Sequence, residues 1–414
     1  MYRKEIEEYI DSHKDQMIED ICTLCRINSE KMPYTEGKPF GEGPFEVLQT
    51  ALTMMENYGF SVRNYDNYVG TADLNDKEAQ LDILAHLDIV PAGEGWTVTE
   101  PFEPVIKDGK LYGRGTADDK GPAVAALYAM RAVKELGIPV KKNVRLILGT
   151  DEECGSSDIA VYYKQEKEAP MTFSPDAEFP VINVEKGRLP GHFVASFEKS
   201  DAMPKLVKID AGLKSNVVPG KAKAVVAGVE DAVLNETADA VTKETEVTFT
   251  FTGCEEGVLI TAEGEGAHAS TPEEGKNALT ALLMLITKLP LASCPQMDAV
   301  KSLVKLFPHG DTRGKALGVA MSDEVSGELT IAFDLLHVDA ESLDGTCAND
   351  ENALKVAKAH MAEEGIELLA EHMRAPHYVD GDSHFVRTLL KAYEEYTGLK
   401  GSCQYTGGGT YVHS

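Results

Sequence analysis

The stretches LDILAHLD (residues 81–88) and VRLILGTDEE (residues 144–153) decide the fold, because each is a short apolar run that ends in polar residues. Between them, residues 121–136 carry Ala and Leu at the spacing of a buried helix face. A strand, a helix and a strand in this order predict a right-handed parallel βαβ unit. In such sheets the functional groups lie just beyond the carboxyl ends of the strands. That is where the sequence places His86, Asp88, Glu152 and Glu153.

The pattern outside this unit predicts a second kind of domain. Apolar residues recur at helical spacing over residues 4–27 and 45–58. After about residue 180, strand-like pieces alternate with turns rich in Gly and acidic residues, at 205–209, 222–227, 246–252, 257–262 and 329–333. A helix is expected near residues 277–289, and the pattern becomes helical again over residues 385–396.

We therefore predict an α/β fold, with a catalytic domain built on a mostly parallel sheet flanked by helices, and an inserted α+β lid domain. The expected boundaries are residues 1–180 for the first part of the catalytic domain, 181–375 for the lid, and 376–414 for the second part of the catalytic domain. The length of 414 residues exceeds what one core needs and favours two domains.

Composition excludes several functions. The net charge of −28 repels phosphate backbones, so we expect no nucleic-acid partner. The charged N-terminus has no apolar h-region, and no apolar run reaches the roughly 20 residues that span a bilayer, so we expect no membrane association. Seven scattered cysteines suit a reducing cytoplasm. Cys22 and Cys25 form a CxxC inside a helical pattern, which favours core thiols over a zinc knuckle.

Three further residues are candidates for chemistry, and each has an ordinary structural alternative. Asp118, in GRGTADDKGP (113–122), lies in a glycine-rich loop that opens a helix, where an acidic cap is the alternative. Asp176, in SPDAEFP (174–180), follows a short extended run and can be an Asx-type turn. His268 lies in a loop of small residues, GEGAHAS (264–270), and a lone loop histidine is usually a surface residue.

Taken together, these candidates predict a metal site. Alone, the pair His86 and Asp88 can be an incidental strand end, and the acids at 151–153 can be a solvated turn or a metal ligand beside a general base. However, histidine and acidic residues fall at successive strand ends of one predicted sheet. Mixed nitrogen and oxygen ligands indicate zinc, with cobalt or manganese as alternatives.

The same residues, in order and local context, resemble the dinuclear zinc metallopeptidases that include acetylornithine deacetylase, succinyl-diaminopimelate desuccinylase and the carnosinases. The likeness is greatest to the bacterial PepV-type dipeptidases. The segments that carry it run from about residue 80 to the C-terminus: AHLDIVPAGEGW, LYGRGTADDKGP, GTDEECGSSD, FSPDAEFPV, GLKSNVVPGKA, GEGAHASTPEEGKNA and YTGGGTY.

The resemblance implies two zinc ions. His86 and Asp176 would bind one ion, Glu153 would bind the other, and Asp118 would bridge them. The family's final metal-binding histidine lies downstream of the GGGTY segment, at a position that His413 does not occupy. We therefore expect the catalytic domain to be truncated at its C-terminus and its second metal site to be weak.

The resemblance also implies catalytic and substrate-binding roles. Glu152 would be the general base and acid, and Asp88 would orient His86. In the lid, His268 would stabilise the oxyanion and Asn216 would help to anchor the substrate. Leu336 stands where the dipeptidases carry an arginine that binds the substrate carboxylate, which puts recognition of that carboxylate by this position in doubt.

The function expected from these observations is hydrolysis of the amide bond of dipeptides, of the Xaa-His or β-Ala type, by metal-activated water. One alternative is a family relative that binds a peptide-like ligand without catalysis. Another is a deacylase of N-acyl amino acids. The partner is thus a small peptide or an N-acyl amino acid, and the protein is expected to be a monomer or a homodimer.

Overall fold

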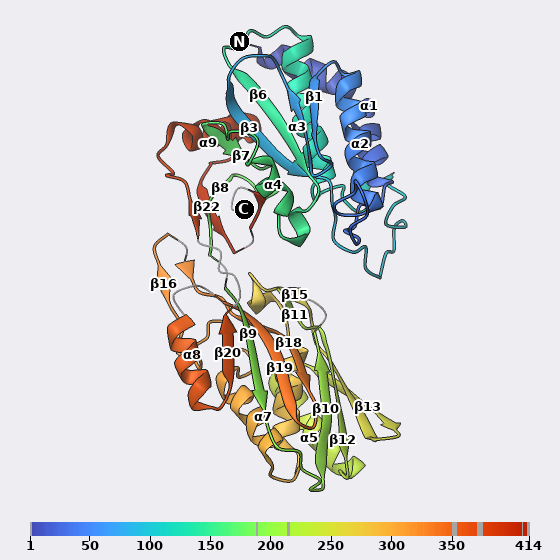
Figure 1. Ribbon diagram of the computed structural model, residues 1–414, viewed down its shortest axis with the longest axis vertical. Helices are drawn as coiled ribbons and strands as arrows, with labels where there is room; N and C mark the ends of the chain where they lie inside the picture. The colour runs from blue at the N-terminus through green and yellow to red at the C-terminus, as the bar shows by residue number, and fades with distance from the viewer. Residues whose placement is uncertain are drawn as a thin grey trace. The chain divides into compact units, whose positions relative to one another are not determined.

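The computed structural model describes residues 2–187, 189–212, 216–325, 327–349, 354–370, 376–407 and 409–411 (Figure 1). The chain divides into two compact units. Unit 1 comprises Met1–Pro180, Arg387–Ala392 and Gly409–Ser414, and unit 2 comprises Val181–Val386 and Tyr393–Gly408. The division shares the C-terminal segment between the units. The predicted domain boundaries, including a catalytic role for residues 376–414, stay a prediction, because compactness does not assign a function to either unit.

Unit 1 contains a five-stranded sheet in the order β1-β2-β6-β3-β7, with α3 connecting the parallel strands β3 and β6. Its elements are α1 (Arg3–Cys25), α2 (Glu42–Asn57), β1 (Ser61–Tyr65), β2 (Val69–Asp73), β3 (Ala79–His86), β4 (Val105–Lys107), β5 (Lys110–Tyr112), α3 (Lys120–Glu135), β6 (Asn143–Gly149), the 3₁₀ turn η1 (Glu152–Cys154), α4 (Ser157–Tyr162) and β7 (Met171–Phe173). The βαβ unit that the sequence predicts is therefore present.

The sheet of unit 1 is mixed, whereas the sequence predicted a mostly parallel one. Strand β3 is parallel to β6 and β7, but β2 is antiparallel to β1 and β6. The reason is a tight hairpin turn between β1 and β2, where Asp66 and Asn67 adopt φ angles of 51° and 62°. The last paired residues are Tyr65 and Val69, so a loop of only three residues, 66–68, reverses the chain and makes β1 and β2 antiparallel.

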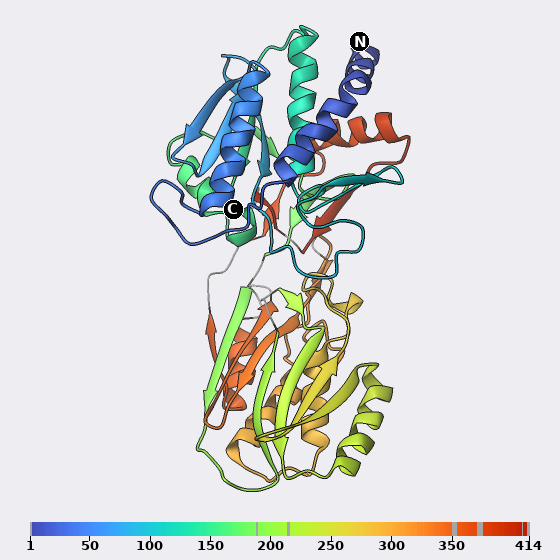
Figure 2. The same cartoon turned by 90° about the vertical axis from the view of Figure 1, so that its right-hand side faces the viewer.

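Both faces of this sheet are covered. Along β3, Ile83 and Ala85 pack into the core shared with α2 and α3, whereas Leu84 packs on the opposite face with Ile159 of α4. This alternation follows from the two-residue period of a strand. Helices α1, α2 and α3 lie alongside one another in Figure 2. Cys22 and Cys25 are free thiols buried in α1, as predicted, and burial raises the pKa of Cys25 to about 11.

A buried ion pair joins the two central strands. Arg145 on β6 donates from Nε and Nη2 to the two carboxylate oxygens of Asp82 on β3, at 2.9 and 2.7 Å. The Asp82 side chain is 0% exposed and that of Arg145 is 8% exposed. Asp82 also accepts a hydrogen bond from the backbone N–H of Ala169. The pair is therefore fully desolvated and held by several hydrogen bonds.

Replacing Asp82 by Ala is expected to lower the free energy of unfolding by about 3–5 kcal/mol, because it leaves the Arg145 guanidinium buried without its main partner. Urea denaturation followed by circular dichroism measures the loss. The matched control is Glu78→Ala, which removes the carboxylate of an exposed ion pair with Lys142 in the same unit and should leave the midpoint unchanged. Equal midpoint shifts for both variants would contradict the prediction.

Unit 2 contains an eight-stranded antiparallel sheet in the order β13-β14-β12-β10-β18-β19-β9-β20. These strands are β9 (Leu189–Ser196), β10 (Lys205–Ala211), β12 (Lys221–Ala227), β13 (Thr248–Cys254), β14 (Gly257–Glu263), β18 (Ala332–Val338), β19 (Ser342–Asn349) and β20 (Glu367–Ala370). Unit 2 also contains the helices α5 (Asp231–Thr245), α6 (Ala278–Lys288), α7 (Pro295–Leu306) and α8 (Leu354–Glu363). Residues of α5, α6 and α7 share one large apolar core with the sheet.

The remaining elements of unit 2 are small. They are β8 (Val181–Glu185), β11 (Val217–Val218), β15 (Ala267–His268), the 3₁₀ turn η2 (Pro272–Glu274), β16 (Ser322–Asp323), β17 (Gly327–Glu328), β21 (His377–Tyr378) and β22 (Cys403–Thr406). Helix α9 (His384–Thr397) is divided between the units, since its residues Arg387–Ala392 belong to unit 1. Strand β8 lies between β21 and β22 in a three-stranded sheet. Among the helices of the described ranges, none is both long and apolar enough to cross a bilayer.

Candidate metal centre

Three predicted ligands converge within unit 1. His86 ends β3, Asp118 lies in the loop before α3, and Asp176 follows β7. His86 Nε2 lies 3.0 Å from Asp118 Oδ1 and 3.5 Å from Asp176 Oδ2. One ligand atom from each residue falls within 4.8 Å of the others. The convergence follows from topology, because β3 and β7 are parallel neighbours whose carboxyl ends share one edge of the sheet.

The hydrogen bonds of His86 suit a metal ligand. Its ring is buried, and Nδ1 lies 3.0 Å from the carbonyl oxygen of Asp88. A carbonyl only accepts, so Nδ1 carries a proton and Nε2 is the ring nitrogen that faces the two carboxylates. Within the described ranges, Nε2 is buried and makes no well-aligned hydrogen bond, although Asp118 Oδ1 lies 3.0 Å away. A buried polar atom of this kind calls for a ligand, and a divalent cation fits the donor set.

The electrostatics of the cluster favour an added positive charge. Burial lowers the pKa of His86, but the carboxylates of Asp118, Asp176 and Asp88 outweigh it and raise that pKa well above its usual value. Burial also raises the pKa of Glu152 to about 8; His86 opposes that rise, and nearby carboxylates reinforce it. A proton on His86 and a metal ion are therefore competing ways of neutralising the same negative charge.

Asp88 does more than was predicted for it. Its Oδ1 and Oδ2 accept hydrogen bonds from the backbone N–H groups of Glu152 and Glu153, at 3.1 and 3.0 Å. Its backbone carbonyl, together with a 3.4 Å contact from Oδ1 to Nδ1, faces His86. Asp88 thus couples the end of β3 to the turn that carries both glutamates. Glu153, the predicted ligand of the second ion, lies outside the three-residue group.

Sequence reasoning missed several residues that hold these loops. The Asp119 carboxylate is fully buried and accepts from the backbone N–H of His86 at 3.0 Å. Burial raises the pKa of Asp119 well above its usual value. Lys120 is also fully buried and donates to the carbonyls of Leu24 and Ile27 at the end of α1. Asp119 and Lys120 follow the exposed Asp118 directly in sequence, and nothing in this run of charged residues distinguishes the two buried ones from the exposed one.

A fourth missed contact comes from the segment between α1 and α2. Lys31 Nζ lies 2.6 Å from Oδ1 of Asp151, whose side chain is 0% exposed. The other oxygen, Oδ2, accepts from the backbone N–H and the hydroxyl of Ser157. The side chain of Asp151, the residue before the two glutamates, is therefore held by Lys31 on one oxygen and by Ser157 on the other. Nothing in the sequence near Lys31 indicates this pairing.

The two predicted lid residues lie side by side in unit 2. Val217, next to Asn216, pairs with His268 across β11 and β15, and the Asn216 carbonyl accepts from the Ala269 N–H. His268 Nδ1 accepts from the backbone N–H of Ser270 at 3.1 Å, which leaves the ring proton on Nε2. Asn216 has a φ of 74°, a conformation that Asn tolerates.

Leu336 faces the interior of unit 2. Its side chain is 0% exposed and belongs to the apolar core of that unit, whereas the neighbouring His337 is exposed and contacts Asp210. The position therefore presents no side chain to a substrate, so a leucine there says little about carboxylate recognition. His413, the other departure noted in the sequence, lies outside the described residues.

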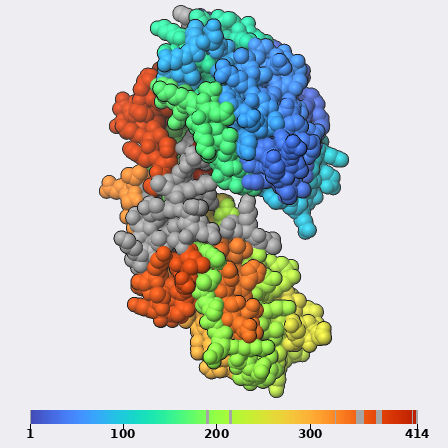
Figure 3. Space-filling model, viewed as in Figure 1, coloured from blue at the N-terminus to red at the C-terminus, as the bar shows by residue number. Residues whose placement is uncertain are grey.

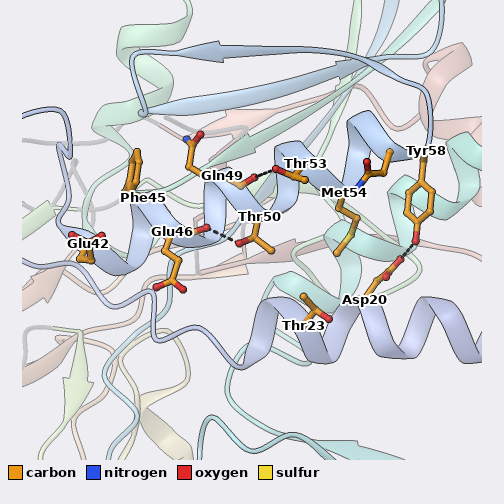
Figure 4. Close-up of a pocket in the computed structure, with 11 residues that line it drawn as sticks. Asp20, Thr23, Glu42, Phe45, Glu46, Gln49, Thr50, Thr53, Met54 and Tyr58 are labelled. Carbon is orange, nitrogen blue, oxygen red and sulfur yellow. Dashed lines mark hydrogen bonds between the residues drawn. The ribbon is translucent and has the colours of Figure 1, made fainter.

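Unit 1 also has an open groove of about 600 Å³ between α1 and α2 (Figure 4). These helices form part of the blue surface in Figure 3. The most buried acid of the groove, Asp20, already accepts from the hydroxyls of Tyr58 and Tyr128. Thr50 and Thr53 donate back to their own helix. The most buried acid of the groove is thus already paired, and the metal cluster remains the better candidate for chemistry.

Comparison with known proteins agrees with this assignment. The model of peptidase family M20/M25/M40 matches residues 83–413. The chain belongs to this family. The putative dipeptidase YtjP of Bacillus subtilis is 35% identical over 415 residues, covering 97% of this chain and 88% of that protein. The beta-Ala-Xaa dipeptidase of Lactobacillus delbrueckii subsp. lactis is 34% identical over 417 residues, covering 98% and 88%.

Solved structures of the M20 family share the fold. Human carnosine dipeptidase 1 superposes with a TM-score of 0.58 at 15% identity, covering 100% of this chain and 88% of that one. The yeast dipeptidase Dug1p of Saccharomyces cerevisiae gives a TM-score of 0.56 at 14% identity, covering 99% and 88%. The resemblance to the M20 metallopeptidases is confirmed, and with it the α/β fold class. The protein is an enzyme, a hydrolase of the metallopeptidase type.

Proposed function

We propose that this M20 peptidase hydrolyses the amide bond of dipeptides, with β-alanyl and Xaa-His dipeptides as its preferred class. The observation that carries the proposal is the cluster of His86, Asp118 and Asp176, in which a buried imidazole nitrogen faces two carboxylate oxygens. The names of the relatives support the substrate class, since one is a beta-Ala-Xaa dipeptidase. We further propose zinc as the metal, with cobalt and manganese as alternatives, because the donors mix imidazole and carboxylate.

The residues that would hold the metal are His86 and Asp176 for one ion, Glu153 for a second, and Asp118 between them. A divalent cation held there supplies positive charge that acidifies water and polarises a carbonyl group. Asp88 supports this arrangement, because its carbonyl holds the Nδ1 proton of His86 and keeps Nε2 available. The number of ions bound per chain stays a prediction.

Glu152 is the proposed proton carrier. Its burial raises the affinity of the carboxylate for a proton, as a group needs that must accept a proton from water and later return it to the leaving amine. His268, with its ring proton on Nε2, is the proposed donor to the developing oxyanion, and Asn216 is the proposed substrate anchor. We also propose a cytoplasmic location, since the seven cysteines are odd in number and widely scattered, a pattern that suits a reducing compartment.

A substrate panel tests the proposal. The full chain, supplied with zinc, cobalt or manganese, is assayed on β-Ala-His, on α-dipeptides ending in His, and on N-acetyl and N-succinyl amino acids. We expect kcat/KM for the dipeptides to exceed that for the N-acyl substrates by at least about 10-fold, because a site that binds a free amine rejects analogues that lack it. The matched control is N-acetyl-β-Ala-His, which differs from the first substrate only at that amine.

The panel also separates the alternatives. Faster cleavage of the N-acyl amino acids would replace the dipeptidase proposal by deacylation. Binding of dipeptides without hydrolysis under any of the three metals would instead indicate a relative that binds peptides without cleaving them. Calorimetric titration of the metal-loaded protein with β-Ala-His distinguishes this outcome from failure to bind.

A further inference from the structure

A buried hydrogen bond lies behind the metal centre, between two residues to which no role has been assigned. The hydroxyl of Tyr411 donates to Oδ2 of Asp158 at 2.5 Å. Tyr411 is 2% exposed and Asp158 is 0% exposed. Both belong to unit 1, where Asp158 lies in the first turn of α4. A carboxylate buried this deeply needs several donors to offset its lost hydration.

Those donors come from the backbone that leads to the two glutamates. Oδ2 of Asp158 also accepts from the backbone N–H groups of Thr150 and Asp151, at 2.6 and 3.0 Å. Oδ1 accepts from the N–H of Ile159 at 2.7 Å. Thr150 and Asp151 occupy the two positions between the end of β6 and Glu152. The carboxylate therefore fixes the chain immediately before the proposed proton carrier.

Tyr411 packs closely against this backbone. A Cβ at Gly149, the last residue of β6, would overlap the Tyr411 hydroxyl and lie against the Asp158 carboxylate. The ring of Tyr411 also stands edge-on to the ring of His86, with centroids 6.2 Å apart and an interplanar angle of 88°. The Tyr411 side chain thus contacts both the ring of His86, at the end of β3, and the backbone that leads to Glu152.

We propose that Tyr411 is a positioning residue for hydrolysis, which acts through Asp158 to hold the Glu152 turn in register with His86. The inference rests on the proposed function, in which Glu152 carries the proton. Loss of the hydroxyl leaves the ring in place but removes one of the four donors to the Asp158 carboxylate. The amides of Thr150 and Asp151 are then held less firmly, and Glu152 departs from its working geometry. Misplacement of a catalytic group lowers kcat more than substrate affinity.

The test compares Tyr411→Phe with Tyr162→Phe. Tyr162 belongs to the same apolar cluster and is 0% exposed, yet within the described part of the chain its hydroxyl has no hydrogen-bond partner. The two variants therefore delete the same atom from the same core, and only one deletion breaks the contact with Asp158. We expect Y411F to lower kcat about 10- to 100-fold with KM within about twofold of wild type, and Y162F to change neither.

A second readout does not depend on activity. Hydrogen exchange should show the amides of Thr150 and Asp151 exchanging at least about fivefold faster in Y411F than in Y162F. Zinc affinity, measured by competition with a chromophoric chelator, should be alike in the two variants. If the wild type cleaves no dipeptide, the proposed function fails, but the exchange measurement still tests the positioning role.

Equal kcat values for Y411F and Y162F in an active enzyme, or equal exchange at the two amides, would overturn the inference. Should Y411F fail to fold, Asp158→Asn provides the second perturbation of the same amides and is expected to give the same fall in kcat at unchanged KM. If neither variant folds, the pair serves stability and not positioning, and the inference is likewise overturned.

Discussion

Replacing Glu152 by Gln is expected to lower kcat for dipeptide hydrolysis by about 10²- to 10⁴-fold, the range that a lost general base costs. The amide keeps the size of the side chain, and the hydrogen bond from the Glu152 backbone to Asp88 remains, so the turn keeps its shape. Only the ability to accept and return a proton is lost. Steady-state kinetics on β-Ala-His, with metal content measured by atomic emission in parallel, checks the expectation.

The control for this variant is Glu78→Gln, which makes the same chemical change at an exposed glutamate of unit 1 that pairs with Lys142. It should leave kcat, KM and metal content unaltered. Near-wild-type turnover in E152Q would show that another group carries the proton. Loss of metal together with turnover would instead make Glu152 a ligand, and its role would have to be exchanged with that of Glu153.

Removing the imidazole of His86 is expected to weaken zinc binding by more than about 100-fold, since a directly bound ligand contributes at least as much as the groups that orient it. His86 is the one nitrogen donor of the described cluster, and its removal leaves two carboxylates facing each other. Chelator competition measures the affinity of His86→Ala. Activity should fall with occupancy, and excess zinc, cobalt or manganese should restore the chelated wild type but not the variant.

His192→Ala is the matched control, because His192 also lies near a carboxylate, with Nε2 3.0 Å from Asp344, but on the surface of unit 2. Its zinc affinity should equal that of wild type. If H86A binds zinc as tightly as this control, the cluster of His86, Asp118 and Asp176 is not the metal centre, and the proposed mechanism has no starting point.

The metal cluster could be predicted because His86 and Asp176 follow strand ends and Asp118 lies in the loop that leads into α3. His86, Asp118 and Asp176 are separated by 32 and 58 residues in sequence, yet parallel pairing of β3 with β6 and β7 brings their edge of the sheet together. The apolar runs of the sequence indicate those strands, and their parallel pairing places their carboxyl ends at one edge of the sheet. The hairpin between β1 and β2 was not predicted, because Asp66 and Asn67 were not read as a turn.

The residues that support the cluster could not be predicted in the same way. Asp119 holds the His86 amide from 33 residues away, and Lys31 holds Asp151 from 120 residues away. A buried charge is recognised by its partner, and one sequence contains no local signal for a partner so distant. Leu336 illustrates the converse, since only the structure shows that its side chain enters the apolar core.

The bond between Tyr411 and Asp158 spans 253 residues. At translation rates of about 5–20 residues per second, roughly 10–50 s separate the emergence of these two partners from the ribosome. During that interval the loop that bears the two glutamates has been synthesised, but the Tyr411 hydroxyl is not yet there to donate to Asp158. We therefore expect the turn that carries Glu152 to reach its final geometry only after residue 411 has been synthesised.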